Sequence, residues 1–144
     1  MPGAQFQNMR ANVLPQMPVP ADERVELSCS NGRAVLRYWV APISGSGRAT
    51  VEFEGCRKII LGAPNDEALG GHRLAQHGLV AFAFHEVTSS DLIAELVDRN
   101  RVHQRHSDAL FSGLRHFLAT FKDETFECVA LTIAVTHDKE VDVL

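Results

Sequence analysis

Two polar segments of the sequence carry side chains suited to proton transfer and anion binding. Residues 62–78 hold Asp66, Glu67 and His72, and residues 99–106 hold three arginines and two histidines. Histidine ionises near neutral pH, so a histidine beside a carboxylate can accept and return a proton. Arginine offers paired N–H groups to a carboxylate or phosphate. These residue types favour acid–base chemistry on a small anionic molecule.

We expect the two segments to form one polar site if they meet in space. Asp66 or Glu67 is then the expected base. His72 or His103 is its partner in proton transfer, and Arg105 holds the anion by its guanidinium. A structural interpretation stays open, in which the two acids only form ion pairs with arginines of the second segment and hold the loop in place.

Three further residues are candidates for contact with the ligand, namely Asn65, His106 and Glu127. Glu127 is notable because it shares a predicted strand face with Val129 and Leu131, which places an acid at the edge of a core. Such a carboxyl must either pair with an arginine or histidine or be protonated.

A metal site is a second interpretation of the histidines. His103 and His106 have H-x-x-H spacing, and His116 or an acid could complete three ligands of a catalytic zinc. This spacing fixes both imidazoles on one side only within a helix, and Arg105 between them opposes a cation. We therefore assign no residue as a metal ligand and expect no cofactor.

The cysteines and the loop motifs exclude other chemistries. Cys29, Cys56 and Cys128 stand singly, without C-x-x-C spacing, and are expected to be reduced, buried thiols. Cys128 is predicted on an apolar strand face, where a thiol is inert. The sequence contains no G-x-x-x-x-G-K-[ST], G-x-G-x-x-G or G-x-S-x-G motif.

Composition limits the partners. The 144 residues carry a net charge of −4, which argues against nucleic-acid or anionic-membrane binding. No apolar run reaches the roughly 20 residues that span a bilayer, and no signal peptide is recognised at the N-terminus, so we expect a cytoplasmic protein. A homodimer is left open.

The elements that position these residues follow from periodicity. Alternating or uniformly apolar runs predict about seven strands, at 24–30, 34–41, 48–54, 56–61, 79–88, 114–122 and 125–135. Ser89 or Ser90 caps a helix whose apolar positions form one stripe. Asp123 and Glu124 are the expected turn of the last hairpin, which would place Thr120 opposite Glu127.

These elements predict an α+β fold with a mainly antiparallel curved sheet, or a partly open β-barrel, and one main helix. Residues 1–22 are expected to be a flexible arm, 23–138 one domain, and 139–144 a frayed end. A docked extended segment around Val13 and Leu14 is the alternative for the arm.

Three blocks of the sequence resemble the signature of a family of small uncharacterised bacterial proteins. They are PNDEA at 64–68 with GH at 71–72, HxRH at 103–106, and TFEC at 125–128. The resemblance covers about residues 34–135 and implies no activity. In the family pattern FHDS precedes the last block, whereas FKDE stands at 121–124, so no role of a histidine at 122 or a serine at 124 carries over.

The leading hypothesis is a domain that binds a small anionic ligand in an Asp/Glu/His/Arg pocket, with acid–base catalysis left open. The alternative is a non-catalytic protein–protein interaction module, of an immunity or regulatory kind. A histidine-ligated metal-dependent enzyme is the second alternative.

Overall fold

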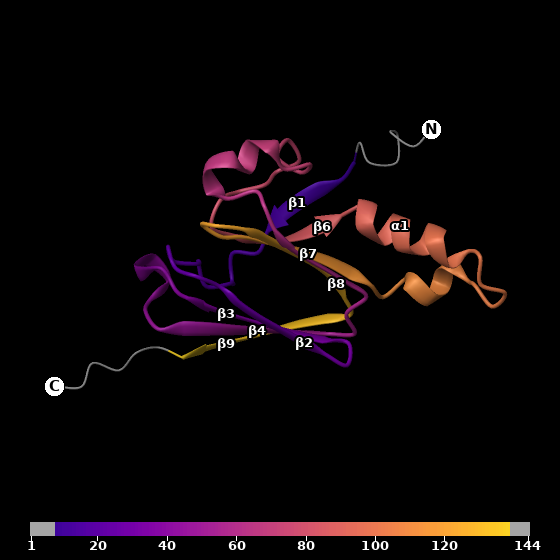
Figure 1. Ribbon diagram of the computed structural model, residues 1–144, viewed down its shortest axis with the longest axis horizontal. Coiled ribbons are helices and arrows are strands. Elements are labelled where there is room, and N and C mark those ends of the chain that lie inside the picture. The colour runs from indigo at the N-terminus through magenta and orange to yellow at the C-terminus, as the bar shows by residue number, and fades with distance from the viewer. Residues whose placement is uncertain (1–7, 139–144) are drawn as a thin grey trace.

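The structure, a computed structural model, describes residues 8–138 and contains two antiparallel sheets that face each other (Figure 1). The five-stranded sheet has the order β1-β6-β7-β8-β5 and the four-stranded sheet the order β2-β3-β4-β9. The α+β class with antiparallel sheets is confirmed. The described residues form nine strands in two separate sheets, more than the seven predicted, and no closed barrel.

The bounds of the elements are as follows. The five-stranded sheet contains β1 (Arg10–Val13), β5 (Lys58–Gly62), β6 (Phe84–Thr88), β7 (Arg115–Thr120) and β8 (Thr125–Ala130). The four-stranded sheet contains β2 (Glu26–Ser30), β3 (Arg33–Trp39), β4 (Arg48–Glu54) and β9 (Thr132–Asp138). The helix α1 spans Asp91–Asn100, and short 3₁₀ helices are η2 (Pro42–Ser44), η3 (Asp66–Gly71) and η4 (Asp108–Phe111).

The main core lies between the two sheets. Leu36 and Tyr38 of β3 face inward, as their alternation predicts, while Arg37 is exposed. Phe53 of β4 is fully buried, with ring centroids 5.6 Å from Phe117 and 5.3 Å from Phe126 of the other sheet. This aromatic contact between the layers is the kind of packing that holds a sandwich together.

Two of the crossings between the sheets, from β4 to β5 and from β8 to β9, are next to each other. Gly55 follows β4 with a φ of +68°, and a Cβ there would lie 2.7 Å from Leu131 Cδ1. Leu131 separates β8 from β9, and its N–H donates to the carbonyl of Glu54. Gly55 is therefore a corner between the two sheets. The single strand predicted at 125–135 is wrong, because the residues on either side of Leu131 belong to different sheets.

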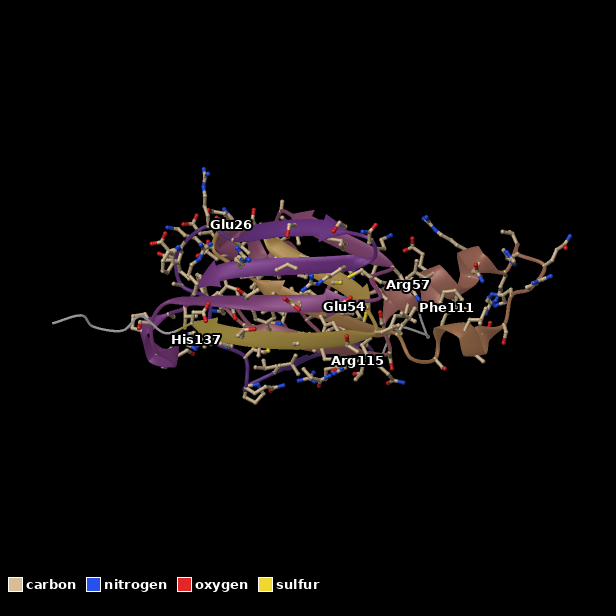
Figure 2. The ribbon with its side chains drawn as sticks, turned by 90° about the horizontal axis from the view of Figure 1, so that it is seen from below. Glu26, Glu54, Arg57, Phe111, Arg115 and His137 are labelled. Atoms are coloured by element: carbon tan, nitrogen blue, oxygen red, sulfur yellow. The ribbon has the colours of Figure 1, made fainter. Side chains whose placement is uncertain are left out.

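The four-stranded sheet has a charged outer face, which Figure 2 shows with Glu54 and His137 near opposite ends. Arg33 of β3 lies 2.7 Å from Glu52 and 3.0 Å from Glu54 on the adjacent strand β4. All three side chains are well exposed, so these ion pairs add little stability.

The N-terminal segment is part of the sheet. β1 pairs antiparallel with β6, the Ala11 N–H donates to His77, and Met17 is buried in the main core. The prediction of a flexible arm is therefore wrong for residues 8–22, and the docked alternative describes them. The remaining residues of the predicted arm, 1–7, and the predicted frayed end, 139–144, lie outside the described residues.

Two other boundaries differ from prediction. The strand predicted at 79–88 begins only at Phe84, since residues 79–83 form a turn with Phe82 at a φ of +52°. The hairpin of β7 and β8 has a four-residue turn, so Leu118, and not Thr120, lies opposite Glu127. A shift of two residues preserves the faces of a strand, so the predicted sides of both strands still hold.

The five-stranded sheet is covered on its second face as well. The excursion of residues 62–78 lies over it at one end, and α1 lies along it at the other (Figure 1). Leu74 of the excursion is fully buried against Leu118 of β7, while Leu92 of α1 packs with Val129 of β8. This double cover makes every residue of β8 buried, including Glu127.

Candidate functional site

Glu127 is a charged side chain in the second, smaller core above β8. The residue is 2% exposed. Arg73 donates from both Nη atoms, at 2.6 and 2.7 Å, and His116 Nε2 lies 2.8 Å from Oε1. His72 Nε2 lies 3.4 Å from Oε2. Of the two predicted alternatives, pairing or protonation, the structure shows pairing, with Arg73 and two histidines.

The neighbouring hydrogen bonds define the tautomers of both histidines. The N–H of Leu74 donates to His72 Nδ1 at 3.0 Å, so the proton of a neutral His72 is on Nε2, facing Glu127. Ser90 Oγ lies 2.7 Å from His116 Nδ1, and Ser90 Oγ itself accepts from the N–H of Ile93 at 3.1 Å. Because the Glu127 carboxylate can only accept, His116 donates to it from Nε2, and the Ser90 hydroxyl donates to the unprotonated Nδ1 of the neutral ring.

Arg73 also binds the first turn of α1. Its Nε and Nη2 atoms lie 2.6 and 3.1 Å from the carboxylate of Asp91, whose Oδ1 accepts from the N–H of Leu92. Residues 62–78, β8 and α1 are thus joined by one guanidinium. We call Glu127, Arg73, Asp91, His72 and His116 the Glu127 cluster.

The electrostatics of the cluster keep both acids ionised. Burial alone raises the pKa of Glu127, but hydrogen bonds from His116, His72 and Arg73 outweigh it and hold that pKa far below its usual range. Burial likewise opposes the ionised form of Asp91, yet the bonds from Arg73 lower its pKa overall. Two carboxylates and one guanidinium leave the cluster with one negative charge beside His116.

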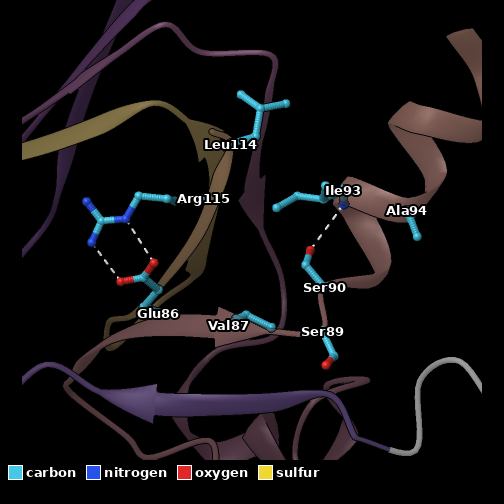
Figure 3. A pocket seen from close by; sticks show the side chains of 8 residues that line it. All are labelled: Glu86, Val87, Ser89, Ser90, Ile93, Ala94, Leu114 and Arg115. Atoms are coloured by element: carbon cyan, nitrogen blue, oxygen red, sulfur yellow. Dashed lines mark hydrogen bonds and ion pairs between the residues drawn. The ribbon is translucent and has the colours of Figure 1, made fainter. Parts of the chain in front are cut away.

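A pocket of about 470 Å³ adjoins this cluster between β6, β7 and α1 (Figure 3). Its apolar lining is Val87, Ile93, Ala94 and Leu114. Its polar lining is Glu86, Ser89, Ser90 and Arg115. We call this the α1 pocket. Ser90 belongs both to its wall and to the hydrogen-bonded chain that ends at Glu127, so the buried acid is connected to a cavity through one imidazole.

The Glu86–Arg115 pair forms one wall of the α1 pocket. Arg115 donates from Nε and Nη2 to the two carboxylate oxygens of Glu86, at 2.9 and 2.7 Å. Its guanidinium carbon lies 4.9 Å from the centroid of the Phe117 ring. The hydrogen bond and the charge of Arg115 lower the pKa of Glu86, although partial burial opposes this.

The structure does not bring the two predicted halves of the site together. Residues 62–78 cover one end of the five-stranded sheet, whereas residues 99–106 lie at and beyond the far end of α1 (Figure 1). Of the eight candidates, only His72 and Glu127 lie in the Glu127 cluster. Arg105 is exposed at the distant end, so it cannot clamp an anion beside either of them.

The other candidates have local roles. Asn65 caps η3 by accepting from the N–H of Ala68, and Glu67 is exposed. Residues Asp66–Gly71 of this loop form η3. Asp66 is half-buried and its N–H donates to the carbonyl of Lys122. These contacts shape the loop and leave the two acids remote from the arginines of 99–106.

The histidines of the second segment serve the end of α1. His106 Nδ1 lies 2.9 Å from Asn100 Nδ2, and its Nε2 lies 2.6 Å from Asp108. His103 Nδ1 accepts from the N–H of Arg105. Within residues 8–138, no group of three His, Cys, Asp or Glu side chains is arranged to hold a metal ion. The geometry therefore does not support the H-x-x-H metal interpretation.

The cysteines only partly match expectation. Cys128 is buried, and burial raises the pKa of its thiol, which agrees with an inert residue. Its Sγ lies 3.4 Å from that of Cys56, which is half-buried. Cys29 is exposed, so the prediction of a buried thiol is wrong there; it lies on β2, an edge strand.

Arg73, Ser90 and Asp91 were not identified as site residues from the sequence, and His116 was considered only as a possible third metal ligand. Ser90 was predicted only as a helix cap, which the structure also shows, with Asp91 in the first turn of α1. His116 falls on the same strand face as Leu118, and the hairpin register brings that face to Glu127. The sequence signal that could have identified His116 is therefore a polar residue at an inward-facing position of β7.

No family model matches the chain, and no curated protein or solved structure is significantly similar to it. A separate observation concerns membranes: the helices among residues 8–138 are all too short or too polar to cross a bilayer.

Proposed function

We propose that this chain is a small-molecule-binding domain whose ligand occupies the α1 pocket and carries an anionic group on a short apolar body. The observation that carries the proposal is the contact between this pocket and the buried Glu127–His116–Ser90 chain. Ligand pockets typically combine an apolar lining with a few well-placed polar groups, and this pocket has both.

The polar wall offers groups for an anion. Arg115 uses Nε and Nη2 to bind Glu86, which leaves the Nη1 hydrogens for a carboxylate of the ligand. The N-terminus of α1 adds the favourable end of its helix dipole beside Ser90. The apolar lining, with Val87 and Ile93, is complementary to a short hydrocarbon segment.

The same geometry supports acid–base chemistry on the ligand. His116 Nδ1 is the candidate basic atom, and it reaches the pocket through the Ser90 hydroxyl. This role replaces the one first considered for Asp66, Glu67 and His103. We place the protein in a bacterial cytoplasm, where its three free cysteines stay reduced.

Binding of straight-chain carboxylates from acetate to octanoate tests the pocket. We expect saturable changes in the amide NMR spectrum centred on Val87, Ser90 and Leu114, growing stronger with chain length. Ala94→Trp should fill the pocket and abolish them. Ala109→Trp places the same side chain at an exposed position on η4 and is the matched control.

Equal binding by both tryptophan variants, or no saturable change with any member of the series, refutes the assignment of an anionic amphipathic ligand to this pocket. Melting temperatures of both variants show that each is folded when it is compared.

A protein–protein interaction module is the second candidate, and one observation favours it. Val102 and Leu110 are 92% and 66% exposed on the extension after α1, close in sequence to three arginines. Exposed apolar side chains of this size are typical of contact sites, including those of homodimers. Binding of a partner, or self-association, that survives Ala94→Trp but is lost with Val102→Glu and Leu110→Glu would favour this function.

A further inference from the structure

Ser90, His116 and Glu127 form a linear chain of hydrogen bonds that leads from the α1 pocket into the core. The two links measure 2.7 Å, from Ser90 Oγ to His116 Nδ1, and 2.8 Å, from His116 Nε2 to Glu127 Oε1. A hydroxyl, an imidazole and a buried carboxylate in this order match the roles of nucleophile, base and orienting acid. In the usual serine hydrolase arrangement Nε2 contacts the serine and Nδ1 contacts the acid, and here the two nitrogens are exchanged. Either nitrogen can act as the base when the other carries the proton.

The surroundings prepare His116 to take the proton of Ser90. Nδ1 carries no proton in the neutral tautomer, because Nε2 donates to Glu127. When Nδ1 gains a proton, the imidazolium lies against a cluster with one net negative charge and neutralises it. His116 is fully buried, so water screens this attraction little.

Ser90 is also held at the position where charge can be stabilised. It is the N-cap of α1, so its Oγ lies at the helix N-terminus. The first N–H groups of a helix have no intrahelical acceptor, and that of Asp91 directly follows Ser90. Such an amide, together with the helix dipole, is suited to an oxyanion on an acyl group attached to Oγ.

We propose that Ser90 is a covalent nucleophile and that the α1 pocket takes esters of short-chain carboxylic acids. The proposal rests on the ligand pocket put forward above: the neutral ester is the substrate, and the anionic ligand assigned to the pocket is the carboxylate that its hydrolysis releases. The apolar residues Val87, Ile93 and Leu114 receive the acyl chain, and the scissile carbonyl lies at Ser90.

The chemical step balances with water as the only further reactant. As Ser90 Oγ bonds to the acyl carbon, its proton moves to His116 Nδ1, and that proton then passes to the alcohol oxygen as the ester C–O bond breaks. Water next attacks the acyl-Ser90 carbonyl and gives one proton to Nδ1. The proton returns to Oγ as the acyl bond breaks, which releases the carboxylic acid and restores Ser90.

A fluorophosphonate probe followed by intact-protein mass spectrometry tests the nucleophile. We expect one adduct on the wild type, mapped to Ser90 by peptide sequencing, and hydrolysis of p-nitrophenyl butyrate. Ser90→Asn keeps a side chain that can cap α1 and should abolish both signals. His116→Gln should slow labelling by about 100-fold or more, the usual contribution of a general base.

Ser107→Asn is the matched control. Ser107 is also an N-cap, accepting from the N–H of Ala109, but no histidine contacts its hydroxyl. We expect its labelling and its hydrolysis rate to equal those of the wild type. The comparison separates the effect of the Ser90–His116 bond from that of replacing any capping serine.

The outcomes of this labelling experiment are distinct from those of the NMR binding experiment with straight-chain carboxylates. No adduct on the wild type, or an adduct that persists in Ser90→Asn, overturns the nucleophile even where octanoate binds. Peptide mapping of the wild-type adduct decides the matter if Ser90→Asn does not fold. Labelling of Ser90 without carboxylate binding supports the nucleophile and refutes only the ligand class proposed above.

Discussion

Replacement of Arg73 by methionine tests whether charge holds the Glu127 cluster together. Methionine keeps an unbranched apolar side chain but removes both bonds to Glu127, at 2.6 and 2.7 Å. Removing one partner of a buried ion pair costs about 3–5 kcal/mol, because the other charge is left uncompensated. Glu127 keeps its bond from His116, and the Arg73 side chain is 37% exposed, so water can replace part of it. We therefore expect a loss of about 2 kcal/mol.

The same variant has a predicted pH dependence. The pKa of Glu127 is depressed in the folded protein, since its bonds from His116, His72 and Arg73 outweigh the effect of burial. Such a carboxyl contributes stability that is present above its unfolded pKa of about 4.3 and is lost as the pH falls through the folded value. Arg73→Met removes part of that contribution. Its destabilisation should be full at neutral pH and shrink as the pH falls below about 4.3.

Urea unfolding followed by the fluorescence of the single tryptophan, Trp39, measures both effects. Arg33→Met is the matched control, because Arg33 pairs with Glu52 and Glu54 on an exposed sheet face. It should cost less than about 1 kcal/mol. An Arg73→Met cost no larger than that of the control, or one that is the same at neutral and acid pH, refutes the ionic account of the cluster.

Two further predictions concern elements next to the site. Burial chiefly lowers the pKa of His85, whose Nδ1 donates to Leu118 and whose Nε2 accepts from Val80. The stability that neutral His85 contributes is therefore full above its unfolded pKa of about 6.5 and declines as the pH falls below that value. His85→Gln should make the melting temperature less dependent on pH between about pH 5 and 7. A pH dependence equal to that of the wild type contradicts this. The N–H of Ala11 in β1 donates to His77 of the 62–78 loop, and the N–H of Leu14 donates to Phe84 of β6, so both should exchange slowly with deuterium. Exchange at the rate of an unstructured peptide would show that β1 is not docked in solution.

Local patterns were enough for much of the fold. The Asn-Gly turn and the alternation around it predict β2 and β3, and Asn31 and Gly32 indeed have positive φ angles. Ser90 and the apolar stripe predict α1 and its cap. These elements depend on the backbone preferences and side-chain periods of contiguous residues, which a sequence displays directly.

Local sequence patterns did not predict which strands pair with each other. β1 has no clear alternation, and it is ordered by bonds to β6, more than 70 residues away in the chain. The break at Leu131 leaves an apolar run uninterrupted, although the chain changes sheets there. Both features depend on long-range hydrogen bonding, for which a short window of sequence has no signal.

For the site, the sequence by itself determined that Glu127 is an acid in a core and needs a partner. Alternate residues of a strand lie on the same face, so the apolar residues two positions away predict that Glu127 is buried. Only the tertiary structure decided which partner it has. Arg73, His116 and Ser90 come from a loop, a strand and a helix cap whose sequence distances imply no contact. They meet because β7 and β8 pair in one register and α1 and the 62–78 loop cover the same face. Arg105 and His103, which look equally suited by residue type, are excluded because α1 carries them away from that face.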